Sequence, residues 1–359
     1  MKKVMFVVPY LYGGGAERVV SIWTSGLAEL GMDVHLLLFY RVEDEYTIND
    51  KVKIHTLSKN RDEYKNLSAL LKIKKMRAIF KAMKPFYIIP FVSYVGTMCF
   101  FARIGLKSKI IETIRIDPRY SPKSKISRWF RNILVYFSKY CMVQNQLQAQ
   151  YFPKFMRKKI VVFSNPISDN ILKHEKRFKS EKIKNIVAVG RLEEQKNYYM
   201  LIDAFSKVEK NKGNLTLNIY GEGSKYEELK RYIKDIGMEN NIFLCGRCNN
   251  VGVVLEQSDL FILSSIAEGM PNSLMEAMAV GLPCISTDCP TGPADLIDNN
   301  INGYLIPIND SDALINSMLD LIENPYKARV MGVNARDKII NNYSASISSA
   351  KLMSFLESC

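Results

Sequence analysis

The chain has 359 residues, a length that favours two domains of roughly 150 to 200 residues over one hydrophobic core and excludes a small disulfide-stapled scaffold. With 47% hydrophobic and 24% charged residues, it has the composition of a folded globular protein and not of a disordered one. Its 50 Lys and Arg exceed its 36 Asp and Glu, and a formal charge of +14 favours an anionic partner: nucleic acid, a phosphorylated substrate or lipid headgroups.

The first half of the chain holds the excess positive charge. Residues 1–172 carry 29 Lys and Arg against 12 Asp and Glu, a net charge of +17, whereas residues 173–359 carry 21 against 24, a net charge of −3. The cysteines lie in apolar segments without the spacing of a disulfide scaffold, which fits a reducing compartment. They are Cys99, Cys141, Cys245, Cys248, Cys284, Cys289 and Cys359.

The N-terminal residues resemble the start of a signal peptide, but Pro9 and Gly13–Gly15 interrupt the apolar run and no cleavage pattern follows. We therefore predict a strand over Val4–Val8, a glycine turn, and a helix over Ala16–Leu30 that ends at Gly31. Strand, glycine turn and helix in this order are typical of a nucleotide-binding α/β unit.

The rest of the first half continues this alternation. The apolar run Phe86–Ala102 is interrupted by Pro90, Ser93 and Gly96 and is too short to span a membrane, so it indicates a buried strand followed by a helix. Alternating strands and helices imply a parallel sheet with helices on both faces. The other predicted elements are strands at Val34–Phe39, Lys53–Leu57 and Cys141–Gln144, a Lys-rich helix at Leu67–Met83, and a basic, aromatic stretch at Arg115–Phe137.

A second domain is predicted after a turn at Asn165–Ile167 and a solvated, linker-like stretch at His174–Lys182. It opens with a strand, a turn and a helix, as the first half does, so we expect two Rossmann-like α/β domains whose parallel sheets face a central cleft. The expected domains are residues 1–168 and 169–344, with a last helix at about 345–359 packing back on the first. The predicted elements are strands at Asn185–Val189, Leu215–Tyr220, Ile242–Cys245, Leu260–Leu263 and Cys284–Thr287, and a helix at Tyr199–Val208.

Two stretches of the second half carry residues suited to binding a nucleotide-linked sugar. In Val189–Asn197, Arg191 and Lys196 lie between a strand and a helix, where a guanidinium, an ammonium and helical amides can hold a diphosphate. In Glu268–Pro283, Glu268 follows a strand and Glu276 lies on the helix opened by Pro271 and Asn272, so one carboxylate can reach a sugar and the other a ribose. The alternatives are a solvated basic turn and two exposed carboxylates.

Taken together, the motifs resemble those of glycosyltransferase family four, the retaining nucleotide-sugar glycosyltransferases of the GT-B fold that include bacterial polysaccharide enzymes. The similarity is strong over residues 185–307 and looser before them. It rests on Gly190-Arg191-Leu192, Lys196-Asn197, Tyr220-Gly221-Glu222-Gly223, Ser258-Asp259-Leu260-Phe261, Glu268-Gly269-Met270-Pro271-Asn272, Glu276-Ala277-Met278-Ala279, Gly281-Leu282-Pro283, Thr287 and Asn302-Gly303, with Gly13-Gly14-Gly15-Ala16-Glu17-Arg18 and Asn165-Pro166-Ile167 in the first half.

The resemblance implies a role for each matching residue. Arg191 and Lys196 would hold the donor diphosphate, Glu276 the ribose and Glu268 the transferred sugar, so that Arg191, Lys196 and Glu268 are the expected catalytic residues. Backbone groups of one segment, Gly269, Met270, Pro271, Asn272 and Ser273, would position sugar and phosphate, and Gly14 and Gly15 would let backbone approach the diphosphate. The implied mechanism is front-face transfer with retention, in which a donor phosphate oxygen takes the acceptor's proton, so that no cofactor and no metal is required.

The acceptor side departs from the family pattern. Many members place a His after the fourth strand, but the corresponding stretch here is Phe91–Tyr94, and His35 and His55 lie in strand contexts that indicate structural roles. The candidate acceptor residues are Glu17, Arg18, Ser93 and Arg115. A zinc site at Cys245, Cys248, Cys284 and Cys289 is the alternative that we reject, because Cys245 and Cys284 belong to apolar strands.

The basic half is expected to contact a membrane. Lys72, Lys74, Lys75, Arg77 and Lys81 are expected on the polar side of one helix, and aromatic residues are interleaved with the cations of Arg103–Arg131, a combination that suits anionic lipid. The expected enzyme moves a hexose or N-acetylhexosamine from a nucleotide-sugar, with UDP-sugar as the expected donor, to a glycan or lipid-diphosphate-linked acceptor in surface polysaccharide assembly. It would work in the cytoplasm, peripherally on the inner face of the cytoplasmic membrane, without nucleic acid as a partner. The alternatives are a solvated basic surface, an epimerase or hydrolase of the same fold, and a non-catalytic membrane- or RNA-binding adaptor.

Overall fold

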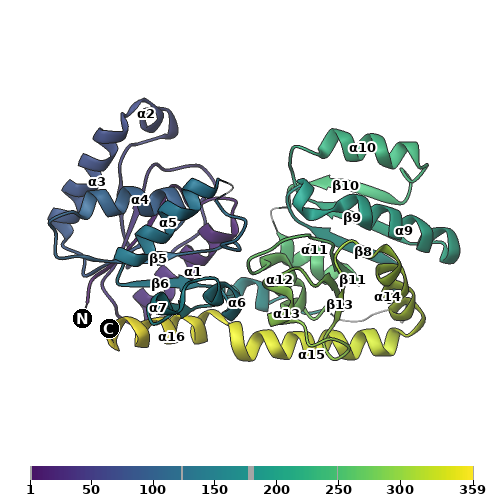
Figure 1. The fold of residues 1–359 in the computed structure, drawn as a ribbon. Coiled ribbons are helices and arrows are strands. Elements are labelled where there is room, and N and C mark those ends of the chain that lie inside the picture. The colour runs from purple at the N-terminus through teal and green to yellow at the C-terminus, as the bar shows by residue number, and fades with distance from the viewer. Residues whose placement is uncertain (1, 123, 177–181, 249, 359) are drawn as a thin grey trace. The chain divides into compact units, whose positions relative to one another are not determined.

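The computed structural model describes residues 2–122, 124–176, 182–248 and 250–358 and contains two compact α/β units (Figure 1). The first unit comprises Met1–Pro166 and Ala345–Cys359, and the second comprises Ile167–Ser344. Each unit has its own parallel sheet wrapped by helices, so the prediction of two Rossmann-like domains is confirmed.

The sheet of the first unit has the order β3-β2-β1-β4-β5-β6-β7. Val4 in β1 pairs with Val34 in β2 on one side and with Tyr87 in β4 on the other. The chain moves outward from β1 to β3 and then crosses back to β4, so the order of the strands reverses between β1 and β4. The strands are β1 (Val4–Val8), β2 (Val34–Leu38), β3 (Lys53–Thr56), β4 (Tyr87–Pro90), β5 (Lys109–Thr113), β6 (Tyr140–Val143) and β7 (Ile160–Val162).

Side-chain caps set the bounds of the helices after β3. The Asn60 side chain accepts a hydrogen bond from the amide of Glu63, and the Ser68 side chain accepts one from the amide of Leu71. The helix predicted at Leu67–Met83 therefore begins at Ala69, and a short helix at Arg61–Asn66, which was not predicted, precedes it. The longer of these two helices ends at Lys84, whose φ of 50° is left-handed. The helices of this unit are α1 (Gly15–Glu29), α2 (Arg61–Asn66), α3 (Ala69–Met83), α4 (Ser93–Arg103), α5 (Lys125–Phe137), α6 (Gln146–Gln150), α7 (Lys154–Arg157) and α16 (Ala345–Ser358).

Helix α3 does not present all of its predicted cations to solvent. Lys75 donates to the carbonyl of Leu57 at 2.8 Å, and Arg77 donates to the carbonyls of Ala102 and Ile104. Lys74 and Lys81 are the exposed cations of the five. The prediction of one basic face turned to anionic lipid is therefore wrong for Lys75 and Arg77, because carbonyl oxygens after β3 and at the end of α4 bind their side chains.

Helix α16, drawn in yellow at the end of the chain, packs on α1 and completes the core of the first unit (Figure 1). Leu352 and Leu356 are fully buried there, and the indole of Trp23 donates to the Ser348 hydroxyl at 2.8 Å. A Cβ on Gly26 would lie 2.1 Å from Ser349 Oγ, so a glycine at this position lets the two helices approach closely.

The sheet of the second unit has the order β10-β9-β8-β11-β12-β13, with the reversal between β8 and β11. The strands are β8 (Asn185–Val189), β9 (Thr216–Tyr220), β10 (Ile242–Gly246), β11 (Leu260–Leu263), β12 (Cys284–Thr287) and β13 (Tyr304–Ile306). The helices are α8 (Asp169–Leu172), η1 (Glu194–Lys196), α9 (Tyr198–Lys212), α10 (Tyr226–Asp235), α11 (Val251–Gln257), α12 (Asn272–Val280), α13 (Pro293–Leu296), α14 (Ser311–Glu323) and α15 (Pro325–Tyr343).

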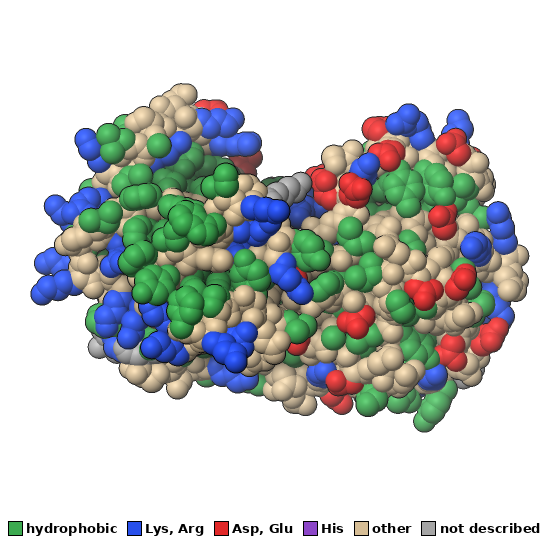
Figure 2. All heavy atoms as spheres, viewed as in Figure 1, with side chains coloured by type: hydrophobic (Ala, Val, Ile, Leu, Met, Phe, Trp, Pro, Cys, Tyr) green, Lys and Arg blue, Asp and Glu red, His purple; other side chains and the backbone are tan. Residues whose placement is uncertain are grey.

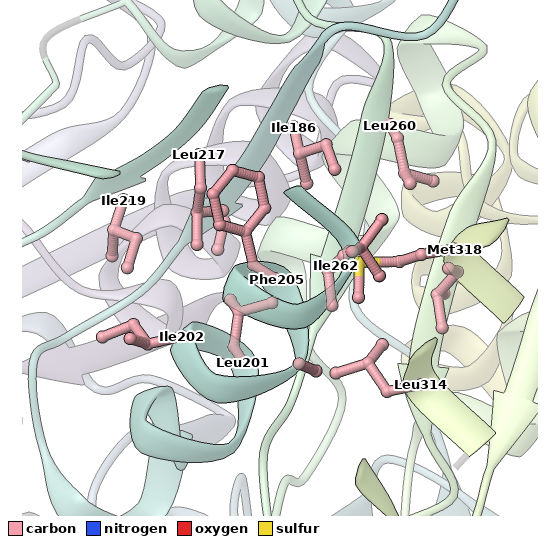
Figure 3. Close-up of a cluster of buried hydrophobic side chains, with 14 of the residues drawn as sticks. Ile186, Leu201, Ile202, Phe205, Leu217, Ile219, Leu260, Ile262, Leu314 and Met318 are labelled. Atoms are coloured by element: carbon pink, nitrogen blue, oxygen red, sulfur yellow. The ribbon is translucent and has the colours of Figure 1, made fainter. Parts of the chain in front are cut away.

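A buried cluster fixes the sheet of the second unit against two of its helices (Figure 3). Phe205 of α9 and Leu314 of α14 contact a layer of aliphatic side chains from β8, β9 and β11, among them Ile186, Leu217 and Ile262. All five are at most 1% exposed, so the central strands have little freedom to move and the loops that follow them start from fixed positions.

The linker prediction is wrong for the described residues at its start. His174 lies 2.9 Å from Glu256 through its Nδ1, and Lys176 Nζ lies 2.9 Å from Asp259 Oδ1, so both are tied to the second unit by polar contacts that the sequence pattern does not reveal. Residues 177–181 of the same stretch lie outside the described residues. Among the described residues, no helix is long and apolar enough to cross a membrane, and Phe86–Ala102 forms β4 and α4 as predicted.

Candidate active site

The candidate donor residues of the second unit gather where its strand order reverses. Arg191 and Lys196 follow β8, and Glu268 follows β11, which is the hydrogen-bonded neighbour of β8. Parallel α/β sheets bind ligands at the carboxyl ends of the strands beside such a reversal. The structure therefore brings three residues together that are far apart in the sequence.

Lys196 and Glu268 form the central ion pair of this site. Lys196 Nζ lies 2.6 Å from Glu268 Oε1, with the two side chains only 14% and 11% exposed. The Ser265 hydroxyl donates to the same carboxylate oxygen at 2.7 Å. A cation and a carboxylate are thus held in a sheltered position at the rim of the sheet, where both can reach a ligand.

The loops that carry this pair are fastened to each other. The amide of Ile266 donates to the Gln195 carbonyl at 2.9 Å, and the Ser264 hydroxyl donates to the Lys196 carbonyl at 2.7 Å. The Gln195 side chain donates to the carbonyl of Ala267. Since three hydrogen bonds link the two loops, the positions of Lys196 and Glu268 are set before any ligand binds.

Arg191 lies beside this pair on the loop after β8. Its side chain is exposed, and within the described part of the chain it has no hydrogen bond or ion pair. The loop after β9 packs against the loop after β8 at Gly221. A Cβ on Gly221 would lie 1.9 Å from the Gly190 carbonyl oxygen, and φ at Gly221 is 153°. The Tyr220–Gly223 motif therefore serves close loop packing.

Helix α12 begins beside Glu268 and carries Glu276. Pro271 is its N-cap residue and supplies no side-chain hydrogen bond, while Asn272 and Ser273 in the first turn are half-buried. Glu276 is 3% exposed. The preceding segment, including Gly269 and Met270, is buried and held by Gly292, where a Cβ would lie 2.4 Å from the Gly269 carbonyl oxygen.

In the first unit, the glycine turn leads directly into α1. Gly14 is the N-cap residue and Gly15 the first residue of the helix. The Glu17 carboxyl folds back over Gly14, where a Cβ would lie 1.9 Å from Glu17 Oε2. Burial raises the pKa of Glu17 above its ordinary value. The missing Cβ of Gly14 thus leaves room for Glu17, while Arg18 lies over the ring of Tyr46, with 5.6 Å between guanidinium carbon and ring centroid.

The other acceptor candidates of the first unit lie at the same edge of its sheet. Ser93 begins α4 after β4, next to Val92, whose φ of 76° is unusual for a β-branched residue. Arg115 follows β5, with its guanidinium over the rings of Trp23 and Phe91 at 4.6 and 4.9 Å. Its Nη1 donates to the Phe163 carbonyl at 3.2 Å. Arg115 is therefore held between aromatic rings instead of projecting freely into solvent.

The strand histidines and the buried cysteines have structural surroundings, whereas the expected apolar surroundings are absent around Cys245 within the described residues. His35 Nδ1 and His55 Nε2 are 2.8 Å apart across β2 and β3, and burial lowers the pKa of both. Cys284 is buried in β12, whereas Cys245 is exposed at the sheet edge. Across residues 2–122, 124–176, 182–248 and 250–358, no three His, Cys, Asp or Glu side chains come together as a group that could hold a metal ion.

Sequence reasoning missed the side chains that support the ion pair. Ser265 touches Glu268, and the buried Tyr198 hydroxyl donates to the Gly190 carbonyl at 3.1 Å. Burial, with the charge of Glu268 as a smaller cause, raises the pKa of Tyr198. The position of Ser265, two residues after the end of β11 and three before Glu268, could have indicated its role; for Tyr198 the sequence offers no such indication.

Glu112 is a buried carboxyl of the first unit for which we predict a measurable effect on stability. It is 5% exposed, Oε1 has no hydrogen-bond partner within the described residues, and burial raises its pKa from 4.5 to about 8. The folded protein thus keeps a proton that the unfolded chain releases, so stability falls as pH rises from 4.5 towards 8.

Glu112→Gln is therefore expected to gain stability relative to the parent as pH rises, by on the order of 3 kcal/mol between pH 5 and pH 8. Denaturant unfolding at several pH values measures this difference. Glu43→Gln, which changes an exposed carboxyl, should show no such trend. Parallel curves for Glu112→Gln and the parent would contradict the burial argument.

Comparisons with known proteins agree with this geometry. Residues 169–338 match the family model described as glycosyl transferases group 1. A Campylobacter jejuni protein named GalNAc-alpha-(1->4)-GalNAc-alpha-(1->3)-diNAcBac-PP-undecaprenol alpha-1,4-N-acetyl-D-galactosaminyltransferase is 29% identical over 348 residues, which are 95% of this chain and 92% of that protein. The Escherichia coli UDP-Gal:alpha-D-GlcNAc-diphosphoundecaprenol alpha-1,3-galactosyltransferase is 34% identical over 158 residues, 43% of this chain and 40% of that protein.

Solved structures share the fold over the whole chain. HepE of Anabaena in complex with UDP-glucose has a TM-score of 0.82 at 18% identity and covers 100% of both chains. TarM of S. aureus has a TM-score of 0.81 at 16% identity, with 99% of both chains covered. The second unit therefore matches the glycosyl transferases group 1, and the similarity along the whole chain supports a glycosyltransferase of the GT-B fold, in agreement with the resemblance to glycosyltransferase family four.

Proposed function

We propose that this protein transfers a hexose or N-acetylhexosamine, with retention of configuration, from a UDP-sugar to a hydroxyl of a lipid-diphosphate-linked glycan. The observation that carries the proposal is the preformed Lys196–Glu268 pair, 2.6 Å apart, beside the exposed Arg191 at the reversal between β8 and β11. Cations for a diphosphate and a carboxylate for sugar hydroxyls are thus fixed within one site.

Each residue has a proposed role in binding the donor. Arg191 and Lys196 bind the diphosphate, Glu268 accepts hydrogen bonds from the sugar, and Glu276 accepts them from the ribose. Backbone groups at both glycine-containing segments add donors for phosphate and sugar. These segments are Gly14 with Gly15, and Gly269, Met270, Pro271, Asn272 and Ser273, of which Pro271 has no N–H and serves as the N-cap residue of α12. On the acceptor side, the candidates remain Glu17, Arg18, Ser93 and Arg115.

The proposed reaction breaks the bond between the anomeric carbon and the diphosphate and forms a bond from that carbon to the acceptor oxygen on the same face. The acceptor's proton passes to a donor phosphate oxygen, and the nucleoside diphosphate leaves with the bonding electrons. Arg191 and Lys196 stabilise the charge that develops on the leaving group, so the reaction as proposed needs no metal and no cofactor.

The proposed acceptor follows from the relatives. The names of the Campylobacter jejuni and Escherichia coli proteins specify acceptors on undecaprenol diphosphate. An acceptor of this kind is anchored in the membrane, so we place the protein in the cytoplasm, peripherally on the inner face of the cytoplasmic membrane. The net charge of +17 on residues 1–172 supports a contact with anionic lipid there.

Thermal unfolding with UDP and a panel of UDP-, GDP- and ADP-sugars tests the donor site. A ligand that binds only the folded state stabilises it by about 2.7 kcal/mol at a hundred times its Kd, so a UDP-sugar is expected to raise the melting temperature. Arg191→Ala and Glu276→Ala should remove this rise, while Arg231→Ala, an exposed arginine on α10, should keep it.

Nucleotide release then separates the remaining functions. Release that requires added membrane extract indicates transfer to a second molecule, whereas equal release without an acceptor indicates a hydrolase. Epimerisation of the sugar without transfer would show that the protein is an epimerase and contradict the proposal. A non-catalytic adaptor would not be stabilised by any nucleotide-sugar. Anomeric configuration of the product, read by NMR, decides between retention and inversion.

A further inference from the structure

Helix α5 exposes the apolar stripe that a surface helix normally buries. Ile126, Trp129, Phe130 and Phe137 follow helical spacing, and Ile126 and Trp129 are 79% and 65% exposed. The buried face of α5 is a different one and carries Leu134 and Val135 together with Arg131, which is 5% exposed. Core packing therefore does not account for the apolar stripe, and an apolar environment outside the unit would.

Neighbouring aromatic rings extend this stripe into a continuous surface. The ring centroids of Tyr136 and Phe155 are 6.3 Å apart, and Phe100 connects Phe137 with Phe101 at 6.2 and 6.0 Å. We call the exposed set the apolar ridge: Phe101, Ile126, Trp129, Tyr136, Phe137 and Phe155. Figure 2 shows hydrophobic side chains gathered over α4 and α5 with Lys and Arg side chains around them.

A basic hollow of about 540 Å³ adjoins the apolar ridge at Phe137. Its cations are Arg103, Lys109, Lys139, Lys158 and Lys159, and no carboxylate lines it. Within the described residues none of the five forms an ion pair with Asp or Glu, and Arg103 Nε is buried without a hydrogen-bond partner. Lys159 donates to the carbonyls of Tyr136 and Ser138, and Arg103 donates to that of Ser108. Lys109, Lys139 and Lys158 have no hydrogen bond within the described residues, so these three make the hollow a receptor for an anion.

The basic hollow lies at the sheet edge opposite the candidate acceptor residues. Lys109 begins β5, and Lys139 and Lys159 directly precede β6 and β7, so the hollow is at the amino ends of these strands. Ser93 and Arg115 follow the carboxyl ends of β4 and β5. The hollow is thus separate from the edge that would bind sugar and acceptor.

The surrounding segment lacks negative charge at its surface. Residues 99–168 contain 14 Lys and Arg and two acidic residues, Glu112 and Asp117, which are 5% and 2% exposed. Apolar side chains next to cations without carboxylate partners match the boundary between acyl chains and phosphate headgroups of a bilayer. Nucleic acid would satisfy the cations but would leave the aliphatic part of the apolar ridge in water.

We propose that the apolar ridge and the basic hollow together form a docking surface for an anionic phospholipid bilayer. The hollow receives a headgroup phosphate, and the apolar ridge enters the boundary of the acyl chains. This sharpens the membrane contact on which the proposed function rests and assigns it to α5 with the basic hollow instead of α3. Docking needs neither donor nor acceptor, so it can be measured separately from transfer.

Tryptophan fluorescence with vesicles tests the apolar ridge directly, because the chain has two Trp residues and Trp23 is fully buried. Vesicles containing phosphatidylglycerol should shift the emission of the full chain to shorter wavelength, while phosphatidylcholine vesicles should shift it much less. Trp129→Phe should lose the shift and still sediment with the vesicles. An emission unchanged by vesicles that do sediment the protein would overturn the placement of Trp129.

Sedimentation with the same vesicles tests the basic hollow. Lys139→Gln with Lys158→Gln should weaken binding by about 25-fold, from roughly fivefold for each cation removed. Lys74→Gln with Lys81→Gln, the exposed cations of α3, is the matched control and should change binding far less. Equal loss in both pairs would overturn the assignment to the hollow, as would binding of inorganic phosphate or an RNA oligonucleotide by a protein that does not sediment with vesicles.

The UDP-dependent rise in melting temperature distinguishes failure of this proposal from failure of the proposed function. The hollow and ridge variants should retain that rise, since their substitutions lie in the first unit and away from Arg191 and Lys196. A protein that responds to UDP but does not bind vesicles would remain a transferase without this docking surface. A protein that binds vesicles but no nucleotide would keep the docking surface and lose the proposed function.

Discussion

Lys196→Met is expected to lower kcat for sugar transfer by about a hundredfold to a thousandfold, the range found when one preorganised group that stabilises transition-state charge is removed. Lys196 Nζ lies 2.6 Å from Glu268, so its loss also leaves a carboxylate without its cation beside the leaving diphosphate. Initial rates with the donor identified by the panel give kcat and KM separately. Lys196→Arg keeps the charge and should recover part of the activity.

Two further variants identify the origin of that loss. Lys212→Met breaks a Lys–Glu pair with Glu323 elsewhere in the same unit and should leave kcat unchanged. If Lys196 served only to hold Glu268, then Glu268→Gln would lose as much activity as Lys196→Met and the double variant no more. A Lys196→Met protein with more than a third of the parent kcat would refute the proposed contact with phosphate.

Trp23→Ala is expected to destabilise the first unit by about 3 to 5 kcal/mol, the usual cost of deleting a large buried aromatic side chain. Trp23 is 0% exposed and contacts Phe91, Phe163 and Arg115, and its indole holds Ser348 of α16. Two units need not unfold together, so unfolding should be followed by calorimetry that resolves separate transitions.

In Trp23→Ala, the unfolding transition of the first unit should move to lower temperature, and that of the second unit should stay unchanged. Trp129→Ala removes an exposed Trp from the same unit and should leave both transitions within about 0.5 kcal/mol of the parent. Trp23→Phe retains most of the apolar contact and loses the hydrogen bond to Ser348, so it should lie between the parent and Trp23→Ala. An unchanged thermogram for Trp23→Ala would contradict the account of this core.

Buried strands were the part of the fold that could be predicted best. Val4–Val8, Leu260–Leu263 and Cys284–Thr287 have the predicted bounds because parallel strands covered on both faces require uninterrupted apolar runs. Helix ends were predicted less well. Helix α9 continues to Lys212 until Gly213, with a φ of 71°, ends it, whereas its apolar periodicity ends at Val208.

The candidate site could be predicted as a set of residue types but not as a set of contacts. Arg191, Lys196 and Glu268 could be named because each follows a predicted strand with a side chain suited to phosphate or sugar, and because their motifs resemble those of glycosyltransferase family four. The position of the Glu17 carboxyl over Gly14 depends on the rotamer of that side chain, which the hydrophobic periodicity of the sequence does not determine. Likewise, the pattern of α5 predicts an apolar stripe but not that the stripe faces away from the core.

The return of α16 to the first unit has a consequence for synthesis on the ribosome. Domains usually fold in the order in which they emerge. Here the N-terminal unit emerges first, but Leu352 and Leu356, which fill its core, are translated after the whole of the second unit. The second unit is contiguous and can finish folding earlier, so the nascent N-terminal unit keeps part of its interior uncovered until α16 has emerged.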